Sequence, residues 1–263
     1  ITDCIPLFFF VYCTGRMYMH KRGTNRTKME GKTYAVVVAA GKGKRMAADV
    51  SKQFMMLRDK PIVAHTLSVF DEQPAIDAIV LVVAARDIEY AEKNIVERYK
   101  YKKPIAAVEG GMERQKSVYN GLMSIKANTS DIVVIHDGVR PLVTGAMVQD
   151  SIDAARAYGA AVVGVPVKDT VKRVNNAGFV MFTPRRDEFW VVQTPQAFKY
   201  GLIREAHERA MQDGFQGTDD AVLVERLGHP VKMVKGCYSN IKITTREDLV
   251  LVQEFMNDLG GIV

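Results

Sequence analysis

Residues 34–54 read YAVVVAAGKGKRMAADVSKQF, an apolar run that breaks into a basic loop. The run at 36–40 is rich in β-branched residues, which is typical of a strand buried on both faces of a parallel sheet. Gly41 and Gly43 allow the backbone to take positive φ and to come close to a ligand. The loop also carries four cations, Lys42, Lys44, Arg45 and Lys52. Exposed amide groups surrounded by cations predict a phosphate-binding loop.

This loop fits neither of the two common phosphate-binding motifs. A G-x-G-x-x-G motif would need glycine at the position of Met46, and a Walker motif would need G-K-S or G-K-T after four residues. A surface turn with solvated lysines explains the same glycines and charges equally well. The loop alone therefore leaves both interpretations open.

The rest of the chain alternates apolar runs with helix-like segments. Apolar runs at 78–84, 105–108 and 132–135 predict further buried strands, and the spacing of apolar residues at 61–70 and 87–100 predicts helices between them. This alternation predicts an α/β fold with a Rossmann-like twisted, mostly parallel sheet and helices on both faces. A ligand then belongs at the carboxyl ends of the strands.

The second half of the chain changes in character. After an apolar run at 160–167, residues 169–181 alternate around an Asn-Asn-Ala-Gly turn, which predicts a β-hairpin. An isolated hairpin is marginally stable in water and needs a partner surface. We expect an irregular, proline-fixed segment at 193–196, two strands at 231–234 and 240–244, and an amphipathic helix at 246–259.

Composition and charge limit the function. The chain has 263 residues, 48% hydrophobic and 25% charged, which is ordinary for a soluble globular protein. No stretch approaches the roughly 20 apolar residues of a membrane-spanning helix. The apolar segment at 5–13 is short and has its basic residues behind it, the wrong order for a signal peptide. We therefore expect no membrane partner.

Residues 1–28 form a basic N-terminal extension. They hold five Lys and Arg against one acid, Asp3, and so contribute +4 of the formal +6. The nearly balanced remainder argues against nucleic acid as a partner. Only Cys237 lies outside this extension, so the body has no disulfide framework and a cytoplasmic location is expected. We expect residues 1–28 to lie outside the fold, with Met29 as the functional start and 29–263 as one domain.

Six further segments identify a family. AAGKGKRM at 39–46 and KQF at 52–54 are followed, in order, by GGMERQKSV, HDGVRP, VPVKDTVKRV, QTPQAF, TDDA and NIKITT. This series resembles the cytidylyltransferases that act on sugar-alcohol phosphates, and most closely those specific for 2-C-methyl-D-erythritol 4-phosphate in non-mevalonate isoprenoid biosynthesis. The resemblance covers nearly the whole chain from Val36 to Leu249.

The resemblance implies a reaction. CMP is transferred from CTP to 2-C-methyl-D-erythritol 4-phosphate, giving 4-diphosphocytidyl-2-C-methyl-D-erythritol and pyrophosphate, with Mg²⁺ as the cofactor. A ribitol-5-phosphate cytidylyltransferase is the nearest alternative, because relatives commonly carry two alanines where this chain has Gly138 and Val139. A non-catalytic nucleotide-binding protein and a nucleic-acid binder built on the basic extension are more distant alternatives.

The resemblance also implies the nucleotide site. Its expected residues are Ala39, Ala40, Gly41, Gly43, Gly110, Gly111, Arg114, Ser117, Asp137 and Arg140. Arg45 and Lys52 are the expected catalytic cations, and Asp137 is the expected metal ligand, since Mg²⁺ accepts one or two carboxylates together with substrate phosphates. From the residues alone, 109–117 could be a plain glycine-rich turn before a helix, and Asp137 could simply cap a turn.

Acceptor binding is implied at a second group of residues. Thr170, Arg186, Thr194 and Lys242 would contact the acceptor phosphate. The hairpin, with its flanks at about 168–187, would be a dimerisation arm that carries Thr170 and Arg186 into the neighbouring subunit's site, so a homodimer is expected. His136 has no second His or Cys at ligand spacing and is expected to be a packed strand-end residue. Asp219 and Asp220 are expected to cap a helix.

Deletion of residues 1–28 should leave activity intact, because MEGKTYAVVVAAG leads directly from Met29 into the first expected strand. Cytidylyltransferase activity and solubility of the 29–263 chain, compared with the full chain, check this. An insoluble or inactive shortened chain would show that the extension belongs to the fold.

Overall fold

The computed structural model describes residues 31–41 and 51–260, which belong to one compact unit. Within these residues, no helix is both long and apolar enough to span a bilayer. The expectation that residues 1–28 form an extension concerns residues outside the described ranges and stays a prediction.

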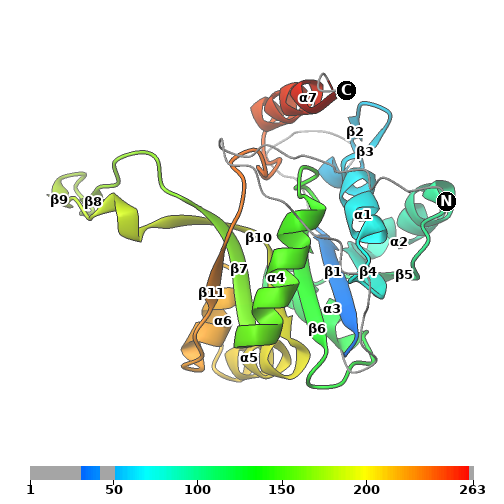
Figure 1. Ribbon diagram of the computed structural model, residues 1–263, viewed down its shortest axis with the longest axis horizontal. Coiled ribbons are helices and arrows are strands. Elements are labelled where there is room, and N and C mark those ends of the chain that lie inside the picture. Colours follow the sequence, from blue (N-terminus) through cyan, green and yellow to red (C-terminus); the bar gives the residue numbers. More distant parts are fainter. Residues whose placement is uncertain (1–30, 42–50, 261–263) are drawn as a thin grey trace, which may run out of the picture. The chain divides into compact units, whose positions relative to one another are not determined.

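A seven-stranded sheet runs through the unit (Figure 1) in the order β11-β7-β10-β6-β1-β4-β5. Its strands are β1 (Thr33–Ala39), β4 (Ala78–Val83), β5 (Ile105–Glu109), β6 (Ile132–Asp137), β7 (Ala160–Pro166), β10 (Trp190–Lys199) and β11 (Lys232–Lys235). All neighbouring pairs are parallel except those of β10, which is antiparallel to β6 and β7. The predicted mostly parallel sheet is therefore confirmed.

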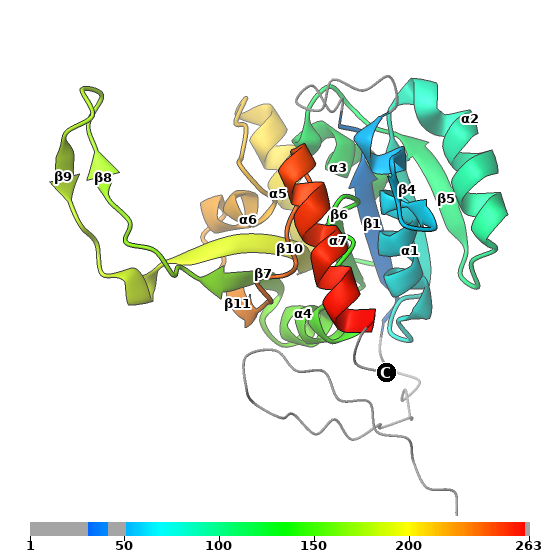
Figure 2. The ribbon, with the colours of Figure 1, turned by 90° about the horizontal axis from the view of Figure 1, so that it is seen from above.

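Helices cover both faces of this sheet (Figures 1 and 2). One face packs against α1 (Ile62–Glu72), α2 (Ile88–Ala91) with its π-helical continuation η3 (Glu92–Glu97), and α4 (Gly145–Tyr158). The other face packs against α3 (Arg114–Met123), α5 (Tyr200–Gln212) and α6 (Ala221–Arg226). Consecutive side chains of β1 point to opposite faces of the sheet, so that Val37 is buried in the first layer and Val36 in the second. Burying such a side chain contributes about 1.5–3 kcal/mol.

A third, smaller cluster lies beside the carboxyl end of β6. Val252 of α7 (Arg246–Gly260) packs there with Ile243, Val139, Leu57 and Ile62. The same region contains the short elements η1 (Lys52–Phe54), β2 (Met56–Leu57) and β3 (Lys60–Pro61), and η2 (Ala85–Asp87) follows β4. This cluster attaches α7 and the segment before it to the end of the sheet where a ligand is expected.

One sequence prediction was wrong, and another is correct only in part. Residues 240–244 form no strand: apart from Ile243, whose N–H donates to the Val139 carbonyl, the segment makes no ladder with the sheet. Residues 193–196 belong to β10, but the predicted irregularity is present, since the pairing of β10 with β7 shifts register between Val192 and Gln196. In both cases tertiary contacts decide the local structure.

The predicted hairpin is present. It consists of β8 (Arg173–Val174) and β9 (Val180–Phe182), joined by a turn in which the Asn175 side chain accepts from the Ala177 and Phe179 N–H groups. The turn ends at Gly178, whose φ of 83° favours glycine. Every residue of β8 and β9 is exposed, and Figure 2 shows both strands away from the large sheet. The 3₁₀ turn η4 (Arg186–Glu188) leads from the hairpin back into β10.

Candidate active site

A cavity of about 520 Å³ opens at the carboxyl ends of β1 and β6. Its lining comes from five separate segments of the chain, and the residues used below are Ala40, Gly41, Lys52, Gly111, Arg114, Ser117, Asp137, Val139, Lys242 and Thr244. The cavity therefore lies where the topology of a parallel sheet places ligands. Several residues predicted from the sequence, though not all of them, meet there.

Asp137, the last residue of β6, is the centre of a charge cluster. Its Oδ1 accepts from Arg114 Nε at 3.1 Å, and its Oδ2 lies 2.9 Å from Lys242 Nζ and 3.6 Å from Arg140 Nε. Burial alone would raise the pKa of Asp137, but the charges of Arg114, Lys242 and Arg140 outweigh burial and hold this pKa well below its usual range. The carboxylate is therefore ionised and has three cations around it, of which Arg114 and Lys242 line the cavity.

Arg140 does not line the cavity and instead connects Asp137 to the segment that carries Lys242. Its Nη1 donates to the Asn240 carbonyl at 2.7 Å. The Asn240 amide in turn donates to Gln193 Oε1 and to the Thr194 carbonyl of β10. Asn240 is fully buried, so these bonds fix residues 240–242 where the sequence had suggested a strand.

Thr194 and His136 form a buried network directly behind Asp137. The Thr194 hydroxyl oxygen accepts from the Asp137 N–H at 3.1 Å and lies 3.0 Å from His136 Nδ1, while His136 Nε2 lies 3.2 Å from the Arg140 carbonyl. Burial lowers the pKa of His136 to about 4, so the ring is neutral near pH 7. Nε2–H then donates to Arg140 and Nδ1 accepts from Thr194. The prediction that His136 is a packed strand-end residue fits this geometry.

The glycines at 110 and 111 allow a close approach of backbone and side chains. A Cβ on Gly110 would come within 2.5 Å of Ala40 Cβ and 2.9 Å of Ser117 Oγ, and one on Gly111 would meet the Lys116 side chain. Ser117 Oγ accepts from the Gly111 N–H at 3.0 Å and donates to the Glu113 carbonyl at 3.0 Å. Ser117 thus holds the loop in place from the first turn of α3, with Gly111 facing the cavity.

Arg114 has a second carboxylate partner that the sequence reasoning missed. Its Nη1 donates to Asp220 Oδ2 at 2.7 Å. Asp219 behaves as expected, since its Oδ1 accepts from the Val222 N–H and caps α6, but the Asp220 side chain makes no capping bond. The capping prediction was therefore wrong for Asp220. A buried carboxylate beside a glycine-rich loop, more than 100 residues from its arginine, carries no local sequence signal.

The basic loop is only partly described. Gly43 and Arg45 lie outside the described residues, so their predicted roles stay predictions. Gly41 and Lys52 line the cavity, and Ala39 and Ala40 do as well. Ser51 donates from its hydroxyl to Asp87 Oδ2 at 3.1 Å, and this bond restrains the residue before Lys52.

The two residues predicted on the arm do not line this cavity. Thr170 is exposed, and exposed Arg186 donates from Nη1 to the Lys168 carbonyl at 2.7 Å. Thr194 is 4% exposed, with its hydroxyl engaged as described above. Of the four predicted acceptor-phosphate residues, Lys242 is the one that faces the cavity within this chain.

The described residues contain no group of three or more His, Cys, Asp or Glu side chains placed to hold a metal. Asp137 offers hard oxygen donors, but both of its oxygens already face cations. This donor set does not make a preformed metal site. It fits a cation whose ligands are chiefly substrate phosphate oxygens, with one carboxylate in addition.

Comparison with known proteins gives consistent results. A model of the 2-C-methyl-D-erythritol 4-phosphate cytidylyltransferase family matches residues 33–258. The enzyme of that name from Alkaliphilus oremlandii (strain OhILAs) is 50% identical over 225 residues, which cover 86% of this chain and 95% of that protein. The one from Geotalea uraniireducens (strain Rf4) is 50% identical over 228 residues, covering 86% and 97%.

A solved structure shows the same fold. The crystal structure of 4-diphosphocytidyl-2C-methyl-D-erythritol synthase from Anaerococcus prevotii DSM 20548 matches with a TM-score of 0.78 at 34% identity, over 86% of this chain and 96% of that chain. The family match begins at the first residue of β1, ends within α7, and includes every segment that contributes to the Asp137 cluster. This chain therefore belongs to the 2-C-methyl-D-erythritol 4-phosphate cytidylyltransferase family.

Proposed function

We propose that this chain transfers CMP from CTP to 2-C-methyl-D-erythritol 4-phosphate, giving 4-diphosphocytidyl-2-C-methyl-D-erythritol and pyrophosphate, as a nucleotidyltransferase of the non-mevalonate pathway. Family membership supports the reaction. The observation that carries the assignment to this cavity is the convergence of Arg114, Arg140 and Lys242 on Asp137. Arg114, Lys242 and Lys52 line the cavity, and a cavity with several cations suits two phosphate-bearing substrates.

The chemistry explains the need for these cations. The acceptor phosphate oxygen is already an anion, so its attack on the α-phosphorus of CTP requires no strong general base. The enzyme must instead align two polyanions that repel each other and neutralise the charge that grows on the α-phosphate and the pyrophosphate. Lys52 and Lys242 on the cavity wall, together with Arg45 of the basic loop, are the side chains proposed for this role.

The base of CTP is proposed to bind at the glycine-rich loop. The proposed contacts are backbone groups at Gly110 and Gly111 and the oxygen of the Ser117 hydroxyl, which its bonds to the Gly111 N–H and the Glu113 carbonyl hold in place. Ala39, Ala40 and Gly41 line the cavity and leave room for the nucleotide, and Gly43 is included from its place in the sequence. A base with the wrong pattern of donors and acceptors would leave buried groups unpaired, which is the physical source of selectivity.

Mg²⁺ is proposed to reach the site bound to the triphosphate, with Asp137 as its protein ligand. When bound, it would neutralise phosphate charge. The fit rests on the hard oxygens of Asp137 at the cavity wall, since a carboxylate plus phosphate oxygens is the usual donor set for this ion.

We propose a homodimer formed through the arm, with Thr170 and Arg186 contacting the acceptor phosphate in the partner's site. The support is an apolar surface on the arm and the adjoining half of β10, made of Val174, Phe179, Val180, Met181, Phe182, Phe189, Trp190, Val191 and Val192, all exposed. Monomers rarely expose so many neighbouring large apolar side chains. Thr194 is kept as a further acceptor contact, and the cytoplasm as the compartment, on the sequence grounds given above.

Ribitol 5-phosphate is the alternative acceptor. Gly138 and Val139, the two residues that suggested it, are largely packed against neighbouring residues. A Cβ added at Gly138 would lie 3.2–3.3 Å from atoms of Ala39, Val38 and Val37, which is a tight contact. Val139 packs in the cluster beneath α7 and is 6% exposed. An alanine pair at these positions would repack the strand end and change only one surface of the cavity.

Pyrophosphate release by the purified chain with CTP and Mg²⁺ tests the proposed function, with 2-C-methyl-D-erythritol 4-phosphate and ribitol 5-phosphate offered in parallel. We expect release with the first acceptor and none above background with the second. Release with ribitol 5-phosphate alone would overturn the acceptor assignment, and release with neither would overturn the proposed activity.

Substitution of the proposed catalytic cations should abolish most turnover with folding intact. For Lys52→Ala and Arg45→Ala we expect kcat to fall at least about 100-fold, which corresponds to about 3 kcal/mol of transition-state stabilisation. Steady-state kinetics with circular dichroism check this. Lys93→Ala, which removes an exposed lysine paired with Glu89, is the control and should keep normal turnover. Near-normal kcat in the Lys52 or the Arg45 variant would mean that the catalytic cation is another residue.

A further inference from the structure

Arg114 is held between two carboxylates that use different N–H groups of its guanidinium. Nε donates to Asp137 and Nη1 donates to Asp220, at 3.1 and 2.7 Å. Both carboxylates are buried, with 8% and 1% of their side chains exposed, while 27% of the Arg114 side chain is exposed. Charge-assisted bonds from one planar group to two fixed acceptors determine its orientation as well as its position.

Asp220 is itself fixed by groups outside the cavity. Its Oδ1 accepts from Nε2 of His207, a fully buried residue of α5, at 3.2 Å. Its backbone N–H donates to Gln196 Oε1 at 3.1 Å, and the next N–H, of Ala221, donates to the same oxygen. Because a carboxylate only accepts, His207 must carry its proton on Nε2. A connected row of contacts therefore runs from α5 through Asp220 and Arg114 to Asp137.

The loop before Asp220 is also attached to the start of α3. Gln115, next to Arg114, donates to the Phe215 carbonyl at 3.1 Å and accepts from the Gly217 N–H at 2.9 Å. Residues 215–220 thus pair with the two consecutive residues that follow the glycine-rich loop. Any displacement of this segment would move Arg114 relative to Gly111 and Ser117.

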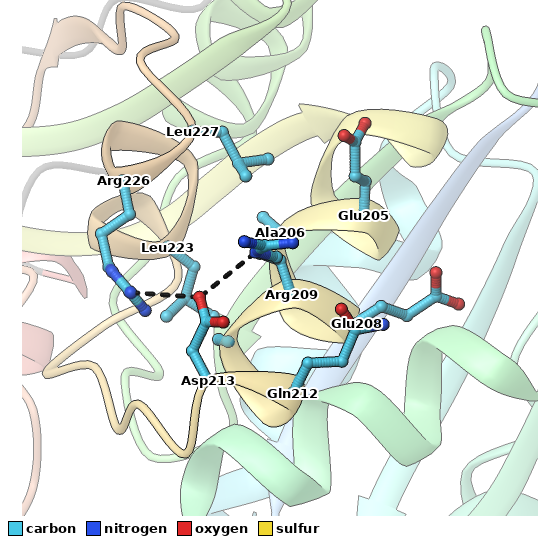
Figure 3. A pocket seen from close by; sticks show the side chains of 10 residues that line it. Glu205, Ala206, Glu208, Arg209, Gln212, Asp213, Leu223, Arg226 and Leu227 are labelled. Carbon is cyan, nitrogen blue, oxygen red and sulfur yellow. Dashed lines mark hydrogen bonds and ion pairs between the residues drawn. The ribbon is translucent and has the colours of Figure 1, made fainter.

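The helices α5 and α6 are also connected by contacts that do not involve Asp220. On their outer surface Asp213 accepts from Arg209 Nε and from Arg226 Nη2, both at 3.3 Å, beside a cavity of about 650 Å³ (Figure 3). Ala206 and Leu223 of the two helices are buried in the same core cluster. The buried charge of Asp220 therefore calls for a role other than helix packing.

We propose that Asp220, oriented by His207, is a positioning residue. It keeps the Arg114 guanidinium with Nε toward Asp137, and it thereby holds the glycine-rich loop in the position that binds CTP. Without Asp220, the Arg114 guanidinium would be free to turn and donate two N–H groups to the Asp137 carboxylate. It would then compete with Lys242 for the carboxylate and leave its place beside the loop. The inference rests on the proposed function for the identity of the nucleotide.

Calorimetric titration of the full chain with CTP and Mg²⁺ tests this role. For Asp220→Asn we expect the Kd for CTP to rise about tenfold, as for loss of a charge-assisted hydrogen bond. The KM for the acceptor should stay within about twofold of wild type, because Asp220 acts on the nucleotide side. In an Arg114→Ala background, Asp220→Asn should add no further loss, since its effect passes through Arg114.

Asp219→Asn is the matched control. It removes a neighbouring carboxylate that also bonds Gln196 and caps α6 but does not contact Arg114, so CTP affinity should stay within about twofold of wild type. Equal weakening by both variants would overturn the inference in favour of a general effect on the loop. Unchanged CTP affinity in Asp220→Asn would also overturn it. A wild-type chain that binds no CTP would instead refute the proposed function.

A second pair of variants covers the case in which Asp220→Asn does not fold. His207→Gln retains an N–H at the position of Nε2, whereas His207→Phe keeps a ring beside Tyr119 and loses the donor. We expect His207→Phe to weaken CTP binding about threefold or more and His207→Gln to restore it, because the Asp220 carboxylate then regains its partner. Equal CTP affinities of the two variants would show that His207 acts by packing alone, and would overturn the inference that it orients Asp220.

Discussion

The ionised carboxylate of Asp137 and its three cations are the interaction on which this site depends. Arg114, Arg140 and Lys242 come from the start of α3, the turn after β6 and the segment before α7. Removing one partner of a buried ion pair leaves an uncompensated charge and costs about 3–5 kcal/mol. One residue at the end of one strand therefore links three parts of the chain.

Much of the fold could be predicted because the strands of a parallel sheet with helices on both faces appear in the sequence as continuous apolar runs. β1 and β4 illustrate this, since consecutive side chains go into opposite, equally buried layers. The turn from Asn175 to Gly178 could also be predicted, because it needs a side chain such as that of Asn175 to accept backbone N–H groups and a residue such as Gly178 that takes a positive φ. These signals are local, and each can be recognised without knowing what the segment packs against.

The parts that failed depend on distant partners. Residues 240–244 look like a strand, yet Asn240 bonds side chains and carbonyls of β10 and leaves Lys242 at the cavity. Asp220 looks like a helix cap, yet its partner is Arg114. The family resemblance pointed to Arg114 and Asp137 but not to Asp220 or Gln196, which form the layer behind them. Electrostatic partners brought together by the sheet leave no spacing pattern in the sequence.

A double-mutant cycle on the free energy of unfolding, with Asp137→Asn and Lys242→Met, tests the central claim that Asp137 organises the cations of the cavity. Urea denaturation of the wild type, both single variants and the double variant gives the coupling energy. Because the two side chains are 2.9 Å apart, we predict a coupling of at least about 1 kcal/mol, the double variant being less destabilised than the sum of the single variants. Additivity within about 0.3 kcal/mol would contradict the account.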